Sequence, residues 1–448
     1  MKRILLTATS VLGLTASLHA ETLHVPAQYS SIQAAINASA DGDEVVVAPG
    51  VYNESVNLMG KGIVVRGAEG AEATTIDATG WNNACMRITS GEGADTVIEG
   101  FTFTGGTGDT SIWGTTTGGG ISMSSSSPSI RDCVFRGNTA KKGGGMNMIG
   151  GAPRIERCIF IDNFASGFGN FQAGGGAIGL YNSWAQIISC EFYANRAYVE
   201  GGAIVIQLGA PTIANGVFVG NRGVTGGAIL NGISDTTLVN CTFVGNIASQ
   251  GAGIRNWSNG SPMDVTVENC IMWDHSLPIQ DVTGASSTLR HCLVEGGWSG
   301  AGDGNTSGHP KFGRMPSAGA DGDWGTADDD YGDLCLQGLS PAINSGDTDV
   351  VPSTVTTDLV GNSRVIGSIV DMGAHEFTEE VIIEDDCRAD IEPAGGNDVV
   401  NVDDLLFMIN SFGTVSPDSP ADIVPPGGDG QVNIDDLLLV ITDFGSCE

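Results

Sequence analysis

The sequence predicts an all-β fold, a right-handed parallel β-helix made of single-stranded coils, followed by a small α-helical pair at the C-terminus. Two observations predict this architecture. A short strand-like phrase recurs between residues 101 and 294, and a different segment with helical spacing occurs twice after residue 388. Nothing between the recurring phrases has helical periodicity, and short alternating runs are typical of strands. The phrases place a large apolar residue at eight positions that are 22 to 32 residues apart: Phe103, Phe135, Phe160, Phe192, Phe218, Phe243, Met272 and Val294.

Each repeat has three features that fit one coil of a β-helix. An aliphatic residue stands five positions before the large apolar residue, an Asn follows three positions after it in five repeats, and a glycine phrase comes next. A unit of about 25 residues cannot bury its apolar face alone, but coils stacked at ~4.8 Å align equivalent residues along one interior. Gly and Asn tolerate the positive φ of tight corners. The aligned glycine phrases are Gly143-Gly144-Gly145-Met146, Gly174-Gly175-Gly176-Ala177, Gly201-Gly202-Ala203-Ile204, Gly226-Gly227-Ala228-Ile229 and Gly251-Ala252-Gly253-Ile254.

These phrases resemble those of known families. The F-x-x-N and G-G-A-I patterns resemble the repeats of polymorphic outer-membrane proteins and related bacterial surface β-helices. Residues 29–36 and 42–52 resemble the N-terminal cap of pectin-lyase-fold proteins. The resemblance covers about residues 21–375, and it implies a pectin-lyase-like β-helix whose open end is plugged by a short amphipathic helix. Covering that end is physically required because it is an exposed sheet edge.

The N-terminus predicts export. Lys2 and Arg3 precede a short apolar stretch from 4 to 14, and Ala20 is small. The stretch is too short to span a bilayer, so residues 1–20 are interpreted as a cleaved signal peptide, with an uncleaved anchor as the alternative. No later run approaches the ~18 apolar residues of a membrane span. We therefore expect a secreted protein, extracellular or associated with a cell surface, with no transmembrane span after signal cleavage.

Charge excludes two classes of partner. The 448-residue chain carries 52 acidic and 19 basic residues, a formal net charge of −33. Such a charge repels nucleic-acid phosphates and anionic membrane surfaces, so we expect neither as a partner. The acid is concentrated, because residues 321–448 hold 28 acids and 2 bases. Dense Asp of this kind is what calcium loops need.

The chain divides into four regions after the signal peptide. We expect the β-helix over 21–315, an acidic loop and C-terminal cap over 316–378, a linker over 379–386 and a duplicated module over 387–448. Residues 340–347 and 371–376 resemble the closing phrases of secreted bacterial β-helix proteins. Six Asp residues crowd into 321–333, where they form either a calcium-tied loop or a solvated acidic loop.

The C-terminal module is an internal duplication with a 32-residue period. Each half has the pattern of an oxygen-rich loop followed by one helix that ends at Gly, and the pair resembles a dockerin-type module of two EF-hand-like units. The resemblance implies bound calcium and a cohesin-like protein partner. The loops span 15 residues instead of the usual 12, and Asp398 stands where Gly430 makes the sharp turn in the second loop. A solvated turn without metal is the alternative. The implied ligands are Asp390, Asn397, Asn401, Asp404, Asp422, Asp429, Asn433 and Asp436.

The ten cysteines fall into different classes. Six share one coil position, where stacking would point them inward as small apolar residues. The spacing C-x-x-C does not occur, which disfavours a redox or zinc site. Cys387 and Cys447 bracket the duplicated module, and because modules of the dockerin type carry flanking cysteines, the resemblance implies a disulfide between them. The six coil cysteines are Cys133, Cys158, Cys190, Cys241, Cys270 and Cys292.

The sequence favours binding over catalysis. A hydrolase of this fold needs clustered Asp carboxylates, a lyase needs Arg or Lys beside acidic calcium ligands, and neither pattern is visible. Asp274-His275 is similar to a pair in pectate lyases, but His275 falls where other coils have the turn Asn. We expect an exported β-helix that binds or processes extracellular polysaccharide or cell-surface glycan, attached through the calcium module. The alternatives are a polysaccharide lyase or glycoside hydrolase with an unrecognised active site, and a purely structural adhesin.

A binding face is predicted at the corner between the turn Asn and the glycine phrase. Most coils have four or five residues there, but eleven separate Gly106 from Gly118 and ten separate Asn163 from Gly174. Both insertions should project from one side of a rigid scaffold, two coils or ~10 Å apart. Exposed aromatic rings offer flat faces to sugar rings, and the alternative is that they fold down to shield the corner. The aromatic residues are Trp113, Phe164, Phe168 and Phe171.

Calcium should fold the C-terminal module. Clustered carboxylates repel one another until a divalent cation neutralises them, so the segment 387–448 is expected to gain helix when calcium replaces a chelator. Asp436→Ala should weaken this response more than Asp398→Ala, because Asp436 is an implied ligand and Asp398 is not. Circular dichroism with chelator and with millimolar calcium measures the change, and identical spectra would contradict the prediction.

Overall fold

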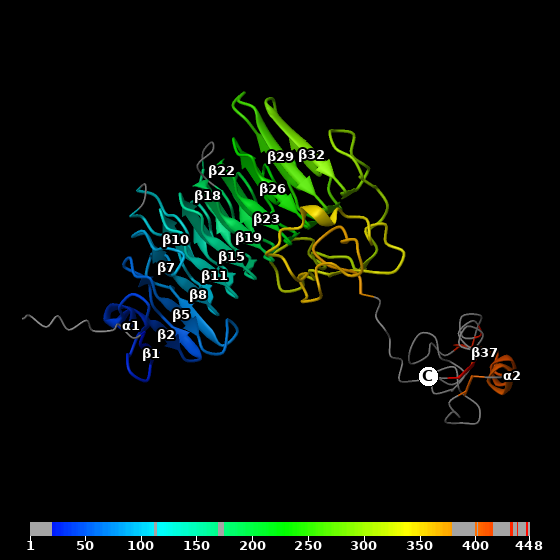
Figure 1. Cartoon of the computed structure of the whole chain (residues 1–448), viewed down its shortest axis with the longest axis horizontal. Coiled ribbons are helices and arrows are strands. Elements are labelled where there is room, and N and C mark those ends of the chain that lie inside the picture. The colour runs from blue at the N-terminus through cyan, green and yellow to red at the C-terminus, as the bar shows by residue number, and fades with distance from the viewer. Residues whose placement is uncertain are drawn as a thin grey trace, which may run out of the picture. The chain divides into compact units, whose positions relative to one another are not determined.

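In the computed structural model the repeats form a parallel β-helix (Figure 1). In the part of the chain that the structure describes, successive coils contribute strands to three long parallel sheets. The structure describes residues 20–111, 114–168, 174–378, 399–400, 402–414, 431–432, 437 and 445–446. The chain forms two compact units, Met1–Phe377 and Thr378–Glu448.

We name the long sheets A, B and C in the order in which the chain enters them. Sheet A contains β1 (Thr22–Val25), β2 (Glu44–Val47), β5 (Val64–Gly67), β8 (Val97–Glu99), β11 (Ser129–Arg131), β15 (Arg154–Glu156), β19 (Gln186–Ile188), β23 (Thr212–Ala214), β26 (Thr237–Val239), β29 (Met263–Glu268) and β32 (Ala285–Arg290). Sheet B contains β3 (Gly50–Tyr52), β6 (Thr74–Asp77), β9 (Thr102–Thr104), β12 (Val134–Arg136), β16 (Ile159–Ile161), β20 (Glu191–Tyr193), β24 (Val217–Val219), β27 (Thr242–Val244), β30 (Ile271–Trp273) and β33 (Leu293–Val294). Sheet C contains β4 (Val56–Asn57), β7 (Met86–Ile88), β10 (Ile121–Ser124), β14 (Met146–Ile149), β18 (Ile178–Ser183), β22 (Ile204–Gly209), β25 (Ile229–Gly232), β28 (Ile254–Trp257) and β31 (Ile279–Asp281).

The large apolar residues of the repeats stack in register inside the helix, as predicted. The six Phe side chains from Phe103 to Phe243 are fully buried, and successive ring centroids lie 4.6 to 5.1 Å apart. Sheet B then pairs Phe243 with Met272 and Met272 with Val294. The eight positions therefore form one row, and the strand spacing lets each ring contact the next.

The turn Asn side chains form a second buried row at the corner between sheets B and C. Asn195 Nδ2 donates to Phe160 O at 2.8 Å and to Asn221 Oδ1 at 3.0 Å. Its Oδ1 accepts from the backbone N and from Nδ2 of Asn163, at 3.1 and 3.0 Å. This asparagine ladder satisfies backbone groups that the corner leaves outside the sheets. Its members are Asn138, Asn163, Asn195, Asn221 and Asn246.

The glycine phrases enter sheet C in register, with one correction. Met146 pairs with Ile178, so Gly175, and not Gly174, corresponds to Gly143. The predicted alignment of this phrase was wrong by one residue. Gly143 and Gly175 have φ of 58° and 70°, and a Cβ at Gly175 would lie 2.0 Å from Ile178 O, so this position requires glycine. Three consecutive glycines left two registers open in the sequence.

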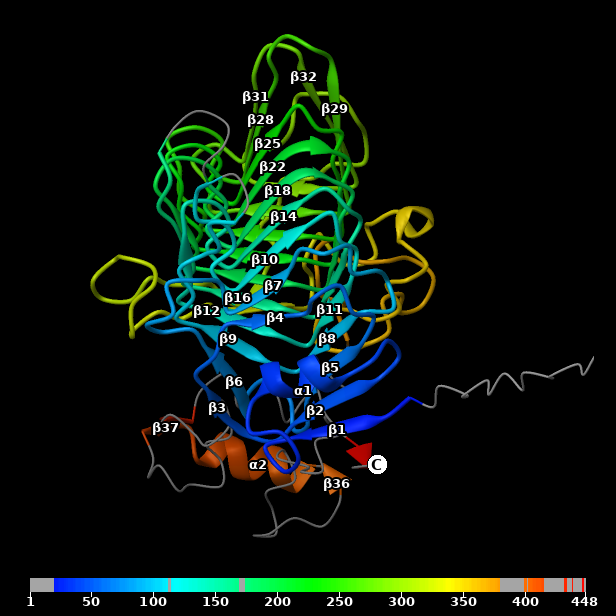
Figure 2. The ribbon, with the colours of Figure 1, turned by 90° about the vertical axis from the view of Figure 1, so that its left-hand side faces the viewer.

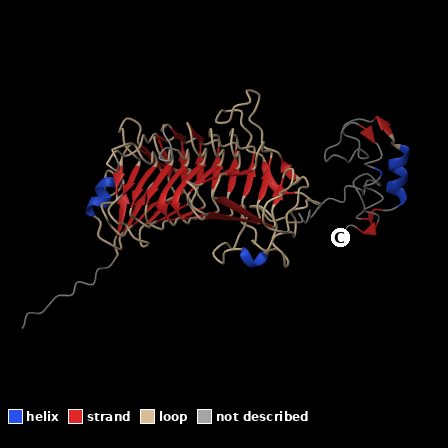
Figure 3. Ribbon diagram, turned by 90° about the horizontal axis from the view of Figure 1, so that it is seen from above, coloured by secondary structure: helices blue, strands red, loops and turns tan. Residues whose placement is uncertain are grey.

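A short helix plugs the N-terminal end of the coils, as the resemblance implied (Figure 2, Figure 3). Helix α1 (Ile32–Ala38) buries Ile32 and Ile36 in the same core as the first strands. Ser31 caps it, because its Oγ accepts from Ala34 N at 3.1 Å. The Glu54 carboxylate accepts from the first two helical N–H groups at 2.9 and 3.0 Å. Its negative charge interacts favourably with the positive N-terminal end of the helix dipole.

After β33 the chain turns back over the outer faces of sheets A and B, seen in yellow and orange in Figure 1. The antiparallel pair β34 (Phe312–Arg314) and β35 (Asp333–Leu336) packs on the outer residues of sheet B, including Val219 and Val244. Past the short helix η1 (Thr348–Val350), Val355 packs on the outer side of sheet A. Strands β24, β27 and β30 carry apolar residues on their outer face as well, among them Val219, Val244 and Ile271, because this tail covers them.

The second unit contains helix α2 (Val402–Asn410) and two reciprocal strand pairs. β36 (Val399–Val400) pairs with β39 (Gly445–Ser446), and β37 (Gly413–Thr414) pairs with β38 (Gln431–Val432). Each half of the duplication thus pairs with the other at equivalent positions. The side chains of all eight predicted calcium ligands, and Cys387 and Cys447, lie outside the described residues. Within the described ranges, no helix is long and apolar enough to cross a membrane.

Removing one rung of the asparagine ladder should destabilise the β-helix. Asn195→Ala leaves the Asn163 amide and the Phe160 carbonyl without their buried partner, which costs about 1–3 kcal/mol per unsatisfied group. The free energy of unfolding, measured with denaturant, is expected to fall clearly. Asn259→Ala, in an exposed loop, is the control and should change little. Equal stability of the two variants would contradict the importance of the ladder.

Candidate binding groove at the corner between sheets B and C

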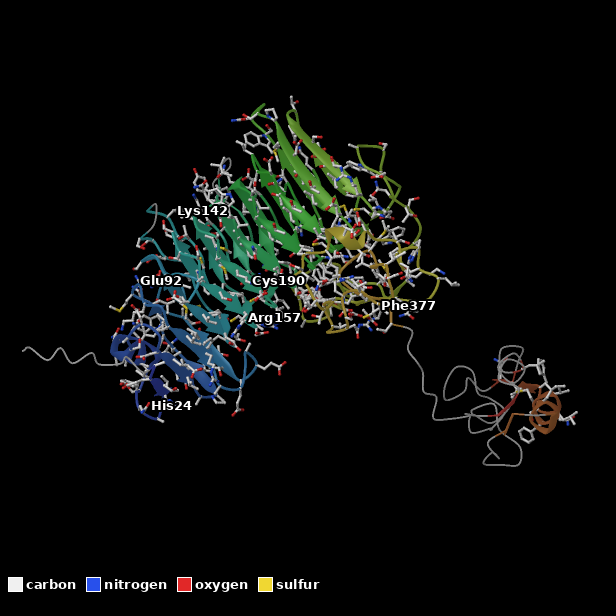
Figure 4. The ribbon with its side chains drawn as sticks, viewed as in Figure 1. His24, Glu92, Lys142, Arg157, Cys190 and Phe377 are labelled. Atoms are coloured by element: carbon white, nitrogen blue, oxygen red, sulfur yellow. The ribbon has the colours of Figure 1, made fainter. Side chains whose placement is uncertain are left out.

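The loops that join sheet B to sheet C stack into a ribbon on one corner of the helix. β13 (Thr139–Ala140), β17 (Phe164–Ala165) and β21 (Arg196–Ala197) form a short parallel sheet there. Isolated bridges continue its register from Arg196 to Arg222 and from Arg222 to Ile247. The residue after each turn Asn therefore lies in one row along the helix axis. In Figure 4, Lys142 marks this corner, and Arg157 marks the corner between sheets A and B.

A groove of about 440 Å³ follows this row. It is lined by residues of the row itself and by the one or two residues that follow Arg196, Arg222 and Ile247. Tyr198, Val224 and Ile247 are exposed at 52, 53 and 42%. Contiguous exposed apolar side chains of this kind are a feature of interaction surfaces. The lining residues are Phe164, Arg196, Ala197, Tyr198, Arg222, Gly223, Val224, Ile247, Ala248 and Ser249.

Two aromatic rings stand together beside the groove. Phe168 is 73% exposed, and its ring centroid lies 4.1 Å from that of Tyr198 at a tilt of 50°. The two residues come from neighbouring coils, so their pairing depends on the insertion that carries Phe168. Together the rings present apolar faces to solvent, which is costly unless a ligand covers them.

Two guanidinium groups occupy the middle of the row. Arg196 lies over the ring of Phe164, 5.6 Å from its centroid, and its Nη2 is 3.7 Å from Asp162 Oδ1. Arg222 Nη1 lies 3.4 Å from Asp323 Oδ1. Both arginine side chains remain about half exposed, so these ion pairs are weak and open to exchange. The groove therefore combines apolar ring faces with positive charge in a strongly acidic protein.

The predicted binding face is only partly described. Phe164 lies in β17 and lines the groove, and Phe168 lies beside Tyr198. Trp113 and Phe171 lie outside the described residues. The C-terminal ends of the two insertions align with each other along the helix axis, because Thr117 and Gly174 both form β-bridges to Lys142 of the coil between them.

Of the residues that line the groove, the sequence predicted only Phe164. Arg196, Arg222 and Ile247 each follow a turn Asn directly, and Tyr198 comes two residues after Arg196. The register of the repeats locates these positions. Their residue types vary from coil to coil, however, so no repeated chemistry marks them in the sequence.

The acidic loop 321–333 is tied by contacts within the protein. Asp329 accepts from Gly325 N and Thr326 N at 2.7 and 3.1 Å. Asp330 pairs with Arg314 through bonds of 2.6 and 2.9 Å. Among the described residues, no group of three or more His, Cys, Asp or Glu side chains is placed to hold a metal ion. The loop is thus fixed by backbone N–H groups and an arginine.

His275 continues the asparagine ladder, as its register predicted. Its Nε2 lies 3.2 Å from Asn246 Nδ2, and burial lowers the pKa of the imidazole to about 3. A neutral, buried ring at the end of a structural row is not placed to act on a substrate. The similarity of Asp274-His275 to a pectate-lyase pair is therefore confined to sequence.

A cluster of buried carboxylates holds the tail and has a structural explanation. Arg364 Nε donates to Glu376 at 3.0 Å and Arg364 Nη1 donates to Asn215 at 2.8 Å, and both charged side chains are 1% exposed. Burial raises the pKa of Glu376 to about 7, and Arg364 opposes that rise. Perturbed carboxylates often mark active sites. Here, however, the groups are closed off from the surface, and Glu376 also accepts from Asp371 N.

The coil cysteines are buried free thiols, as predicted. All six are buried, together with Cys85, and Cys335 is half-buried. Burial raises the pKa of Cys133 and Cys158 well above that of an ordinary thiol. Their Sγ atoms donate to backbone carbonyls such as Arg131 O at 3.1 Å. Thiols in this state behave as small apolar groups and are inert.

A model of a known protein family agrees with this architecture. The family model "Right handed beta helix region" matches residues 61–243, and the chain therefore contains a right-handed β-helix domain. No curated protein matches the chain. Similar solved structures include the pectate lyase Pel9A, with 14% identity, a TM-score of 0.44 and coverage of 80% of this chain and 96% of that one. An alginate lyase from a Paenibacillus strain has 12% identity, a TM-score of 0.35 and coverage of 59 and 99%. Pectin methylesterase from carrot has 14% identity, a TM-score of 0.32 and coverage of 67 and 84%.

The coil thiols should resist labelling until the β-helix unfolds. Because burial holds their pKa values high, the reactive thiolate is almost absent at pH 8. Alkylation of the native chain followed by peptide mapping is expected to leave Cys133 and Cys158 unmodified, and labelling in denaturant should modify both. The half-buried Cys335, whose pKa is raised to about 11, should react first. Rapid native labelling of Cys133 would contradict the buried row.

Proposed function

We propose that the chain is an exported β-helix protein that binds extracellular polysaccharide in the corner groove without transforming it. The observation that carries the proposal is the Phe168–Tyr198 ring pair beside the guanidinium groups of Arg196 and Arg222. Ring faces stack on the apolar faces of sugars, and guanidinium forks bind carboxylates and sulfates. An acidic polysaccharide carries both chemistries. It is therefore the ligand class that we propose.

The shape of the site favours a polymer. The row from Phe164 to Ile247 spans three strand steps, or about 14 Å, which accommodates a few sugar units along the helix axis. Sites for small molecules usually enclose most of their ligand. Here lining residues such as Tyr198, Val224 and Ile247 are partly exposed. A bound ligand would therefore keep one side in water, as a long polysaccharide chain does.

Export and attachment are further parts of the proposal. Residues 1–20 have the pattern of a signal peptide, which would deliver the protein to extracellular glycan. We propose that the module 387–448 binds calcium through the eight implied ligands and attaches the β-helix to a cohesin-like partner or to a surface. The 32-residue duplication and the reciprocal pairing of β36 with β39 and β37 with β38 support a two-fold module of this type.

The groove is tested by removing its ring pair. The double variant Phe168→Ala/Tyr198→Ala should bind polygalacturonate or alginate about tenfold more weakly or worse, since each ring contributes of order 1 kcal/mol. Retention on the immobilised polysaccharide and calorimetry measure binding. The melting temperature should change little, because Phe168 and Tyr198 are mostly exposed.

Two controls make this test specific. Trp184→Ala removes a ring that is 51% exposed and is not part of the groove lining, and it should leave retention unchanged. Assays for unsaturated products and new reducing ends should stay negative, and a positive result would identify an enzyme. If the double variant loses stability and keeps retention, the rings only shield the corner and the proposed groove is wrong.

A further inference from the structure

An acidic loop of the tail borders the groove. We call residues 317–330 the strap. Its base is closed by Ser317 and Asp330, which exchange two backbone hydrogen bonds of 2.8 and 2.9 Å. Arg314 holds the same point through Asp330. The base of the strap is therefore anchored, and residues 318–329 form a loop with fixed ends that reaches sheet B.

The strap contacts sheet B next to the groove. Trp324 covers Gly220, where an added Cβ would lie 2.4 Å from its ring, and Gly220 has a φ of 65°. Gly220 immediately precedes the turn Asn and is two residues before Arg222. Tyr331, just after the strap, stacks on Tyr193 of β20 at 4.6 Å and lies 5.9 Å from the Trp324 ring. Aromatic contacts thus fix the strap beside the row of groove residues.

The fixed strap places a carboxylate on a groove guanidinium. Asp323 Oδ1 lies 3.4 Å from Arg222 Nη1, and the two side chains are 71 and 59% exposed. The strap carries five Asp residues and no basic residue. A carboxylate held in this way has the charge and the contact that an acidic sugar would need at Arg222.

We propose that the strap is an autoinhibitory element, in which Asp323 competes with an acidic polysaccharide for Arg222. This inference rests on the proposed function of the groove. A tethered competitor acts at a high effective concentration, and its remaining carboxylates repel an anionic chain. Because the ion pair is exposed and weak, the ligand displaces Asp323 without moving the anchored base. The strap then tunes affinity and favours ligands with enough charge to replace it.

Relieving the competition should strengthen binding. In the full-length protein, Asp323→Asn is expected to raise the affinity for polygalacturonate about two- to fivefold, the range of an exposed ion pair. Asp349→Asn is the matched control, because it removes the same charge from an exposed position in the tail, outside the groove lining and the strap. Binding of dextran, a neutral probe, should be equal in all three proteins. Calorimetry at low ionic strength measures these affinities.

The outcomes separate the two proposals. Suppose that the wild type binds polygalacturonate and that this binding requires Phe168 and Tyr198. If Asp323→Asn then binds no more tightly than Asp349→Asn, the strap is not inhibitory, while the proposed function of the groove stands. If neither wild type nor Asp323→Asn binds, both proposals fall. A second variant, Trp324→Ala, releases the strap by another route and should also strengthen binding. Weaker binding by Trp324→Ala with an unchanged melting temperature would overturn autoinhibition, since the strap would then contribute to the site.

Discussion

The buried asparagine ladder is the interaction on which the rest of the β-helix depends. At the corner between sheets B and C the backbone leaves one sheet before it joins the next, so its polar groups need partners from elsewhere. Each Asn supplies them from the neighbouring coil, which fixes the register of the coils from Asn138 to Asn246 relative to one another. Loops of four to eleven residues can then emerge after the Asn without disturbing the stack. The candidate groove lies at this corner, where the ladder fixes the backbone and the loop after each Asn varies in length and residue type.

The interior was predictable and much of the exterior was not, for one physical reason. Interior positions touch their equivalents in the next coil, so the same residue type recurs, and the rows of Phe, Asn and Cys are visible as repeats. A surface residue such as Arg222 has no such neighbour requirement, and its type is unconstrained by the repeat. The error at Gly174 has the same origin. Where three glycines follow one another, the residue letters do not distinguish the registers, and the pairing of Met146 with Ile178 decides between them.

The part of sheet B that the tail covers has a signal in the sequence. Strands β24, β27 and β30 alternate poorly because apolar residues face both ways, and the tail covers their outer side. The sequence carried this signal, but it did not identify the covering segment. The acidic composition of the tail also has several causes. The carboxylates of Glu376 and Asp371 accept hydrogen bonds from backbone N–H groups, and Glu376 also accepts from Arg364. Asp323, in contrast, lies exposed at the groove.

The local placement of charge explains how an acidic chain could bind the acidic ligand that we propose. The net charge of −33 gives long-range repulsion, but screening limits that field to about 10 Å at ordinary ionic strength. Within that distance, the proposed recognition would depend on the guanidinium groups of Arg196 and Arg222 and on the neighbouring rings, not on the total charge. The strap brings acid inside the screening distance, at Arg222. In the proposed mode of binding, a carboxylate beyond that distance would have little effect on affinity, whereas Asp323 on the strap would have a direct effect. The placement of charge along the chain then matters more than its sum.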